Sequence, residues 1–402
     1  MVHGSPLAAC SELLAREFPR TGEGVFFNTA AQGIMPRRAI DAMAAFERGR
    51  QYPNQIDDPL LQHVEETCRA RVAALMNVPA RRVGLALNTS EGLNLAALQF
   101  PLKAGDRVLV QRRDFPANVL PWMAQSSRGI ELVFLDPEAG GHLGADDVAQ
   151  ALDADPSVRA VSLPLVHFST GHRHAIEEIG AVCRARGVWL AVDAIQGIGA
   201  VPFDAGETDA DLVACGGQKW LCAPWGSGFF TVSERLLAAK PVRAGWLQVA
   251  RARSGAGAYD DLCDPELDWP AGADRFEVGT YAYTALLGLS ESVALLLEVG
   301  IERVAAHARF LQDRALAFLD EHGATLVSCR APACRSGILC FRLDDASATR
   351  ALHERLVRSG VACAHREGAI RLATHLYNTP ADVDAALEAM AAAWPAARVA
   401  VR

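Results

Sequence analysis

Short apolar runs alternate with amphipathic segments through the first two thirds of the sequence. The apolar runs predict strands at Val83–Leu87, Asp106–Gln111, Ile130–Leu135, Ala160–Leu165, Val188–Val192, Leu212–Ala214 and Phe229–Val232. The segments between them have helical periodicity and predict helices over 89–98, 116–124, 145–153 and 175–186. Strands that alternate with helices of about a dozen residues indicate a mostly parallel sheet covered by helices on both faces. The expected fold class is therefore α/β.

The two ends of the sequence predict a second, smaller unit. Before the sheet, helices are expected over 7–18, from Pro36 onward and over 60–76, with a short strand at Val25–Phe27. Residues 247–272, rich in Gly, Ala, Asp and Pro, predict an irregular connection. Later elements are helices over 282–298, 301–321, 347–359 and 380–393 and strands over 325–327, 338–343, 361–364 and 370–373. We expect a large domain over 22–280 and a small domain formed by 1–21 and 281–402.

The composition is that of an ordinary globular protein. Of the 402 residues, 50% are hydrophobic and 21% are charged, which argues against disorder. The net charge of −8 provides no basic surface for nucleic acid or for an anionic membrane. The sequence has no apolar run long enough to span a bilayer and no secretory signal at its start. The 10 cysteines are scattered without CxxC spacing, which predicts reduced thiols in a cytoplasmic protein.

The stretch Asp211–Phe230, DLVACGGQKWLCAPWGSGFF, contains an unusual lysine. Lys219 follows two glycines and Gln218, and it precedes the bulky pair Trp220–Leu221. Lysine is rarely buried without a partner, and apolar surroundings lower its pKa so that the amine becomes a nucleophile near neutral pH. The alternative is a surface turn whose lysine has no chemical role. This stretch alone leaves the two interpretations even.

Polar residues follow several predicted strands, at the sheet edge where ligands bind in open α/β folds. Thr89 and Ser90 stand at a helix start, where backbone N–H groups and the helix dipole attract anions, although a simple helix cap would look the same. Phe115 offers either core packing or a flat surface for a planar ring. Asp193 follows a wholly apolar strand, so it either caps a helix or needs a partner such as a protonated ring nitrogen.

A phosphate site, a stacking ring, an acid for a ring nitrogen and a reactive lysine together describe a site for pyridoxal 5′-phosphate, which the lysine would hold as a Schiff base. His167, His172 and His174 cluster in HFSTGHRH, but no carboxylate or Cys has metal-ligand spacing to them, so turn and helix-start roles are favoured and no metal site is predicted. The sequence lacks GxGxxG, GxxxxGK[ST] and GxSxG, the usual dinucleotide, P-loop and hydrolase motifs.

The chain resembles the class V aminotransferase family of fold-type I pyridoxal-phosphate enzymes, which includes cysteine desulfurases, isopenicillin N epimerases and kynureninases. The resemblance runs over nearly the whole chain, through FFNTAAQGIMP, NTSEGLN, DFPANVLPW, VHFSTG, AVDAIQGIGAVPFD, GGQKWLCAPWGSGF, DRFEVGT and RLATHLYNTPADVDAAL. It implies the fold-type I architecture, in which a large domain with a mostly parallel sheet is joined to a smaller C-terminal α/β domain. It also implies a homodimer with shared active sites.

The resemblance implies roles for individual residues around the cofactor. Lys219 would hold pyridoxal phosphate and serve as general acid and base, and Asp193 would bind the pyridine nitrogen. Gln196 would bind the phenolic oxygen of the ring, and Phe115 would stack on its face. The residues implied for phosphate binding are Thr89, Ser90 and Gln218, together with Thr280, which would reach the phosphate of the neighbouring subunit.

The substrate side follows from the same resemblance. Arg371 would clamp the substrate carboxylate as a planar fork, with Asn28, Ala31 and Phe168 beside the substrate. We expect an aminotransferase-type reaction on an α-amino acid, through removal of the Cα proton by Lys219. The alternatives are β C–S lysis, cysteine desulfuration and epimerisation. A non-catalytic binding or sulfur-carrier scaffold is the alternative of another class.

Two departures weaken the desulfurase alternative. Desulfurases of this type carry a nucleophilic Cys on a loop before the carboxylate arginine, and the connection Gly360–Arg371 is too short for that loop. Cys363 lies in a predicted strand, which favours a structural thiol, while Cys329 and Cys334 lie near a loop and stay as outside candidates. Phe168 stands where many desulfurases have an Asn near the ring.

Overall fold

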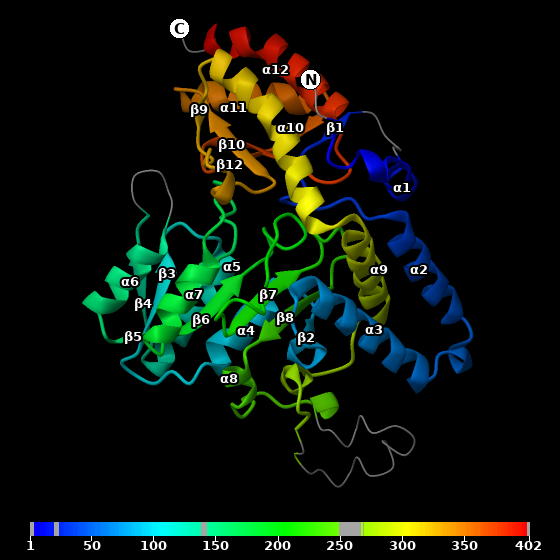
Figure 1. The fold of residues 1–402 in the computed structure, drawn as a ribbon, viewed down its shortest axis with the longest axis vertical. Coiled ribbons are helices and arrows are strands. Elements are labelled where there is room, and N and C mark those ends of the chain that lie inside the picture. Colours follow the sequence, from blue (N-terminus) through cyan, green and yellow to red (C-terminus); the bar gives the residue numbers. More distant parts are fainter. Residues whose placement is uncertain (1–3, 20–23, 138–142, 249–266, 268, 400–402) are drawn as a thin grey trace.

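A computed structural model describes residues 4–19, 24–137, 143–248, 267 and 269–399. The chain forms a large region around a seven-stranded sheet and a small region around a four-stranded sheet (Figure 1). The long helix α10 (Ile301–Glu321) runs from the large region up into the small one. The irregular connection predicted over 247–272 lies mostly outside the described residues.

The seven-stranded sheet has the order β2-β8-β7-β6-β5-β3-β4. β8 runs antiparallel to both of its neighbours and every other pairing is parallel, so the predicted mostly parallel sheet is confirmed. The strands are β2 (Val83–Ala86), β3 (Arg107–Gln111), β4 (Glu131–Leu135), β5 (Val158–Pro164), β6 (Trp189–Asp193), β7 (Leu212–Gly216) and β8 (Gly228–Val232). All residues of β2, β7 and β8 are buried, as their apolar sequences predict.

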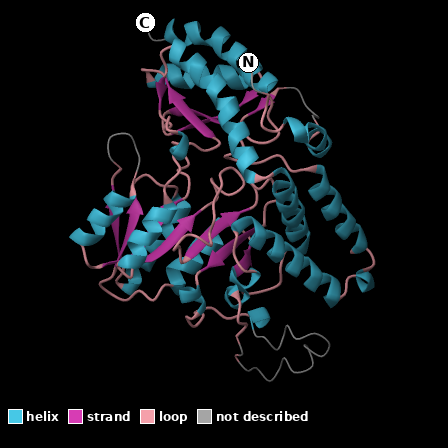
Figure 2. Cartoon of the chain, viewed as in Figure 1, coloured by secondary structure: helices cyan, strands magenta, loops and turns pink. Residues whose placement is uncertain are grey.

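Helices cover both faces of this sheet (Figure 2). Because side chains alternate along a strand, Leu109 of β3 belongs to one core cluster while Val108 and Val110 belong to the other. The helices of the large region are α4 (Thr89–Gln99), α5 (Pro116–Met123), α6 (Ala145–Ala154), α7 (Ile176–Ala185) and α8 (Glu234–Leu237). α4 and α5 contribute to the cluster with Val108, whereas α6 and α7 contribute to the cluster with Leu109.

The remaining helices flank the sheets. α2 (Arg37–Gly49) and α3 (Asp58–Met76) pack against α9 (Tyr283–Val299) beside the large sheet. The others are α1 (Ser11–Glu17), α11 (Ala346–Arg358) and α12 (Pro380–Val399). Short 3-10 helices lie at Ala8–Cys10, Pro53–Gln55, Ala80–Arg82, Ala124–Arg128, Trp246–Gln248, Ala273–Phe276 and Pro332–Cys334.

The small sheet is antiparallel, with the order β12-β13-β10-β9. Its strands are β9 (Thr325–Leu326), β10 (Ile338–Arg342), β12 (Ala364–Arg366) and β13 (Ala369–Ala373). The single strand predicted over 361–364 is wrong, because the chain forms β11 (Val361–Ala362) and then β12, with Cys363 between them.

β11 pairs in parallel with β1 (Val25–Phe26), a strand close to the other end of the chain. β1 thus hydrogen bonds within the small region, although the predicted boundary at residue 22 assigns it to the large domain. That boundary stays a prediction.

Among the described residues, no single helix is both long and apolar enough to cross a membrane. Helices α9 and α10 reach that length and apolar composition only when they are taken together, and they are bent by 76° where they meet.

Candidate active site

Lys219 lies in the turn between β7 and β8, at the sheet edge where ligands bind in this kind of fold. The Gly217 N–H donates to the Ser227 carbonyl (2.8 Å), and the Gly33 N–H donates to the Gln218 carbonyl (2.8 Å). A Cβ added to Gly33 would lie 2.1 Å from the Lys219 carbonyl oxygen. The glycines therefore allow a close approach of two backbone segments that fixes the lysine backbone.

The Lys219 amine is partly buried and close to an aromatic ring. Its Nζ lies 5.5 Å from the centroid of the Phe115 ring. Burial lowers the pKa of Lys219 to about 8, with the nearby Asp193 carboxylate opposing the change and the Arg371 cation adding to it. The amine is still mostly charged at pH 7, but its uncharged share, which a nucleophile or a general base requires, is far larger than that of an ordinary lysine.

Asp193 ends β6 and is buried. Within the described chain its carboxylate accepts one hydrogen bond, from the Ile195 N–H to Oδ1 (3.1 Å). Burial raises the pKa of Asp193, and the Lys219 cation opposes the increase. A carboxylate with so few partners is costly to bury unless a ligand supplies a positive charge.

The predicted anion site lies at the start of α4, and the structure corrects one point about the cap of this helix. The cap is Asn88, whose Oδ1 accepts the Glu91 N–H (3.0 Å), rather than Thr89 or Ser90. Thr89 and Ser90 are the first two helical residues, whose N–H groups have no partner inside the helix. Thr89 Oγ1 accepts the Gly216 N–H (2.9 Å), and a Cβ added to Gly216 would lie 2.7 Å from Gln218 Oε1. Thr89 and Gln218 therefore flank one glycine at the end of β7.

Gln196 connects the site to the turn near the start of the chain. Its Nε2 donates to the Ala30 carbonyl (3.0 Å), and its Oε1 accepts from Trp220 Nε1 (2.8 Å). An amide has two N–H donors, so one is left for a ligand. In the same turn the Ala31 N–H donates to the Asn28 carbonyl (2.9 Å), and the buried Asn28 Oδ1 has no partner in the described chain.

Arg371 lies on β13 of the small region and is buried. Its Nη1 donates to the Phe168 carbonyl (2.8 Å), and its Nε has no partner in the described chain. Burial lowers the pKa of Arg371 to about 10. A buried guanidinium with a single neutral acceptor is suited to a ligand carboxylate. The Phe168 ring stands edge-on to Phe115, with centroids 5.4 Å apart, so the predicted stacking and substrate-side rings are neighbours.

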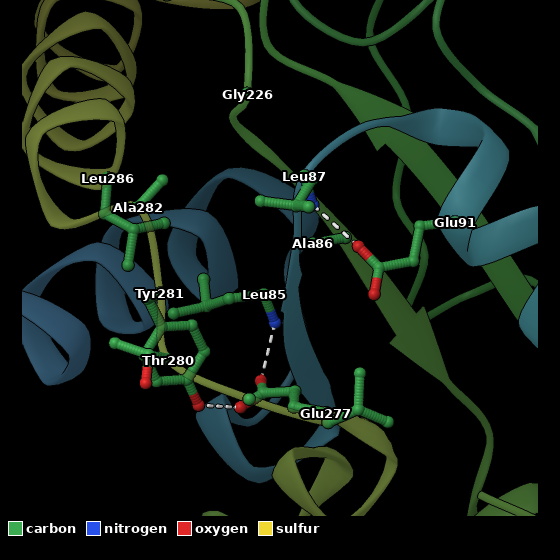
Figure 3. Close-up of a pocket in the computed structure, with 12 residues that line it drawn as sticks. Leu85, Ala86, Leu87, Glu91, Gly226, Glu277, Thr280, Tyr281, Ala282 and Leu286 are labelled. Atoms are coloured by element: carbon green, nitrogen blue, oxygen red, sulfur yellow. Dashed lines mark hydrogen bonds between the residues drawn. The ribbon is translucent and has the colours of Figure 1, made fainter. Parts of the chain in front are cut away.

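Thr280 is placed apart from the other predicted residues. It is exposed and lines a cavity of about 130 Å³ together with Leu87, Gly226 and Tyr281 (Figure 3). No described contact joins it to Lys219. Its predicted role toward a neighbouring subunit stays a prediction.

A supporting chain of polar residues was missed by the sequence analysis. Asp114 Oδ1 accepts the Phe115 N–H (2.6 Å), and its Oδ2 accepts from Asn118 Nδ2 (2.7 Å). Asn118 Oδ1 accepts from Ser162 Oγ (2.6 Å). Burial raises the pKa of Asp114 to about 7, and the negative charge of Asp193 adds to the increase. The spacing of Asp114 and Asn118, four residues apart around Phe115, is the signal that could have revealed this support.

The cysteines near the site are enclosed. Cys215 and Cys222 are buried on either side of Lys219 in the sequence, and burial raises the pKa of both thiols. Cys363 is buried too, and its pKa is raised to about 12, which supports its interpretation as a structural thiol. Two cysteines of the small region, Cys329 and Cys334, approach His172 from more than 150 residues away in sequence, a contact that spacing along the chain does not predict.

Comparisons with known proteins identify the family of the chain. A model of the aminotransferase class-V family matches residues 25–386. A probable cysteine desulfurase of Pyrococcus abyssi is 27% identical, over 93% of this chain and 95% of the relative. The isopenicillin N epimerase of Streptomyces clavuligerus is 28% identical, over 91% of this chain and 94% of the relative.

A solved structure shares the fold. It is a complex between a cystine C–S lyase and its reaction product cysteine persulfide, and it superposes with a TM-score of 0.83 at 24% identity, covering 93% of this chain and 99% of that one. The predicted fold-type I architecture is confirmed by this likeness. The chain belongs to the aminotransferase class V family.

Proposed function

We propose that this protein is a pyridoxal-phosphate-dependent enzyme that acts on an α-amino acid, with Lys219 as the residue that holds the cofactor and moves the Cα proton. Family membership supplies the cofactor class. The observation that carries the assignment is the triad of under-paired charges, in which the Asp193 carboxylate and the Arg371 guanidinium both act electrostatically on the Lys219 amine. Each group lacks the partner that a cofactor or substrate would supply.

The residues present fit this cofactor. The cradle for its phosphate is formed by the first N–H groups of α4, the Thr89 hydroxyl and Gln218, around a glycine that leaves no room for a Cβ. Asp193 fits a protonated ring nitrogen, and the free N–H of Gln196 fits the phenolic oxygen. Phe115, 43% exposed and 5.5 Å from Lys219 Nζ, offers its face to the ring.

Bound pyridoxal phosphate supplies the electron sink that makes the Cα proton acidic. Arg371 holds the substrate carboxylate in a fork, which fixes how the other bonds of Cα point. Asp193 retains its negative charge beside the ring nitrogen and keeps a proton there. Lys219, whose lowered pKa of about 8 makes its uncharged form accessible near neutral pH, accepts the Cα proton and returns it at a chosen carbon.

The finer reaction that we propose is of the aminotransferase type, in which Lys219 returns the proton to the cofactor-side carbon. The second candidate is β C–S lysis, which needs no protein thiol. β C–S lysis is favoured over desulfuration by the burial of Cys363, the thiol nearest in sequence to Arg371. A buried thiol with a raised pKa is a poor carrier for the persulfide that desulfuration forms. Because one relative is a probable cysteine desulfurase, cysteine itself is also a substrate to test.

A substrate screen distinguishes these reactions. The holoenzyme is incubated with single amino acids and thioether amino acids, with and without a keto acid acceptor. Keto acid formation that requires the acceptor supports transamination. Pyruvate with ammonia supports β-lysis, and racemisation without either product supports epimerisation. A protein that takes up no pyridoxal phosphate, and stays colourless, contradicts the whole proposal.

We also infer a homodimer, because large apolar side chains are exposed at Leu87, which lines the cavity with Thr280, and at Trp225, which precedes the lining residue Gly226 in the sequence. Trp225 is 67% exposed and Leu87 is 50% exposed, and Leu87 lines that cavity with Thr280 (Figure 3). A dimer would cover these side chains and bring Thr280 near the site of the other subunit. The mass in solution, measured by light scattering, is expected to be twice 43.0 kDa. A monomer at every concentration contradicts the inference, and Trp225→Ser is expected to shift a dimer toward monomer.

A further inference from the structure

A histidine and two cysteines meet where the two regions of the molecule join. His172 lies in the loop between β5 and α7 of the large region, and Cys329 and Cys334 lie in the loop between β9 and β10 of the small region. One ring nitrogen of His172 and the two sulfur atoms all lie within 4.8 Å of one another. The imidazole is buried, while both cysteines are partly buried.

We propose that His172, Cys329 and Cys334 form a Zn²⁺ site between the large and small regions. Two thiolates and one imidazole are ligands that zinc prefers over calcium or magnesium. From zinc–ligand bonds of about 2.0–2.3 Å, ligand atoms of one tetrahedral site lie about 3.4–3.8 Å apart. The observed limit of 4.8 Å is close to that spacing, so small side-chain rotations bring the three atoms onto one ion. A water molecule would complete the tetrahedron.

The backbone around the three ligands is fixed by hydrogen bonds across the same junction. The Arg173 N–H donates to the Cys334 carbonyl (2.9 Å), and Ser328 Oγ donates to the Thr170 carbonyl (2.6 Å). Ser336 Oγ donates to the Gly171 carbonyl (2.7 Å). A Cβ added to Gly171 would lie 2.5 Å from the Ile338 carbonyl oxygen, which shows how closely the two loops approach. The ligands are therefore held together before any metal arrives, which lowers the entropic cost of binding.

The position of the site connects it to the substrate arginine. The loop that holds His172 also contains Phe168, whose carbonyl accepts the hydrogen bond from Arg371 Nη1. An ion held by both loops would stiffen the junction that positions this guanidinium. We therefore expect zinc to raise the thermal unfolding temperature and to leave the chemistry at Lys219 in place. The zinc site does not depend on the proposed reaction, because metal binding is measured on the protein with or without cofactor.

The test is metal binding by untagged, reduced, chelator-treated protein. Titration with Zn²⁺ against a chromophoric chelator is expected to reveal one tight equivalent per chain. Co²⁺ in its place is expected to give the visible bands of a tetrahedral site with thiolate ligands. The wild-type protein alone can thus contradict the proposal, through the absence of a tight equivalent or a cobalt spectrum without thiolate bands.

Variants then assign the ligands. Cys329→Ser, Cys334→Ser and His172→Gln are each expected to weaken zinc binding by more than about 100-fold, since even changes behind the ligands cost 10–100-fold. The matched controls are Cys363→Ser, a buried cysteine elsewhere in the small region, and His63→Gln, and both are expected to keep the wild-type affinity. Equal affinity in all five variants would overturn the assignment. So would a Cys329–Cys334 disulfide in the purified protein combined with no zinc uptake after reduction.

Discussion

Two buried carboxylates of this protein have opposite surroundings. Glu277 accepts hydrogen bonds from the Leu85 N–H (2.7 Å) and from Arg69 Nη1 (2.8 Å) and Nη2 (3.4 Å), as well as from the Tyr281 hydroxyl (Figure 3). These partners lower its pKa despite complete burial. Asp193, also buried, accepts one hydrogen bond from a backbone N–H in the described chain, and its pKa is raised.

The difference separates a structural charge from one that awaits a ligand. A buried ion pair whose acceptors are all occupied has no hydrogen-bonding capacity left for a ligand. Removing one partner leaves the other charge buried and unpaired in the core. A buried carboxylate with few partners destabilises the fold, so its presence suggests that function requires it. The two arginines differ in the same way: Arg69 pairs with Glu277, whereas the hydrogen bond of Arg371 within the described residues goes to a neutral backbone carbonyl. We therefore propose that the under-paired charges, Lys219 among them, mark the active site.

The largest effect on activity is expected when the lysine among the under-paired charges is replaced. Lys219→Ala is expected to lower turnover by about 10³-fold or more, because it removes both the attachment point and the general base. Borohydride reduction of wild-type protein with pyridoxal phosphate, followed by peptide mapping, is expected to label Lys219. The remaining lysines, Lys103 and Lys240, are exposed and serve as controls in the same digest. Turnover that survives in Lys219→Ala would contradict the assignment.

A matched pair of variants tests the comparison of carboxylates directly. Glu277→Gln is expected to lower the free energy of unfolding by about 3–5 kcal/mol, because Arg69 is left buried without its counter-charge. Asp193→Asn is expected to change stability by less than about 1 kcal/mol while lowering activity, because its charge has little to pair with before the cofactor binds. Chemical denaturation and turnover of both variants are the measurements. A large loss of stability in Asp193→Asn would remove the distinction drawn here.

Arg371 is expected to affect substrate binding rather than cofactor binding. Arg371→Lys keeps the positive charge but loses the fork, and we expect the KM for the amino acid to rise about 10–100-fold, the value of one or two charged hydrogen bonds. Cofactor uptake, followed by absorbance, is expected to stay within about twofold. A variant that loses the cofactor instead would place Arg371 at the phosphate and not at the substrate.

The smallest effect concerns pH. The pKa of Lys219 is lowered to about 8, so its amine is mostly charged at pH 7 and mostly free at pH 9. The rate at which the apoprotein captures pyridoxal phosphate is therefore expected to rise about tenfold between these values and then to level off. An amine with the ordinary pKa of 10.5 would still be gaining about tenfold per pH unit. Continued increase above pH 9 would mean that burial does not tune this lysine.

Much of the fold was predictable because its strands are apolar on both faces. The strands of the large sheet appear within about two residues of the apolar runs that predict them, and helix α10 appears over the predicted range 301–321. Local pattern failed where a tertiary contact decided the outcome. The break at Cys363 separates β11, which pairs with β1, from β12, which pairs with β13. The local sequence contains no signal that predicts this change of partner.

The site residues show the same division. Lys219, Asp193 and the start of α4 stand directly after apolar strands, so their meeting at one sheet edge followed from strand order. The support of Phe115 by Asp114 depends on burial, which residue types alone do not reveal. The approach of Cys329 and Cys334 to His172 depends on how the two regions dock, and no spacing rule along the chain contains that information.

The pairing of β1 with β11 has a consequence for how the protein is made. Val25 pairs with Val361, and Asn28 forms a bridge with Ala373, so the turn that we predict beside the substrate is held by a segment synthesised more than 300 residues later. Contacts of such separation form late in folding, because closing a long loop is slow. The strands of the sheet around Lys219 are therefore all made before the segment that holds the turn at Asn28. We expect this turn to gain its final position only after every strand of that sheet has been synthesised.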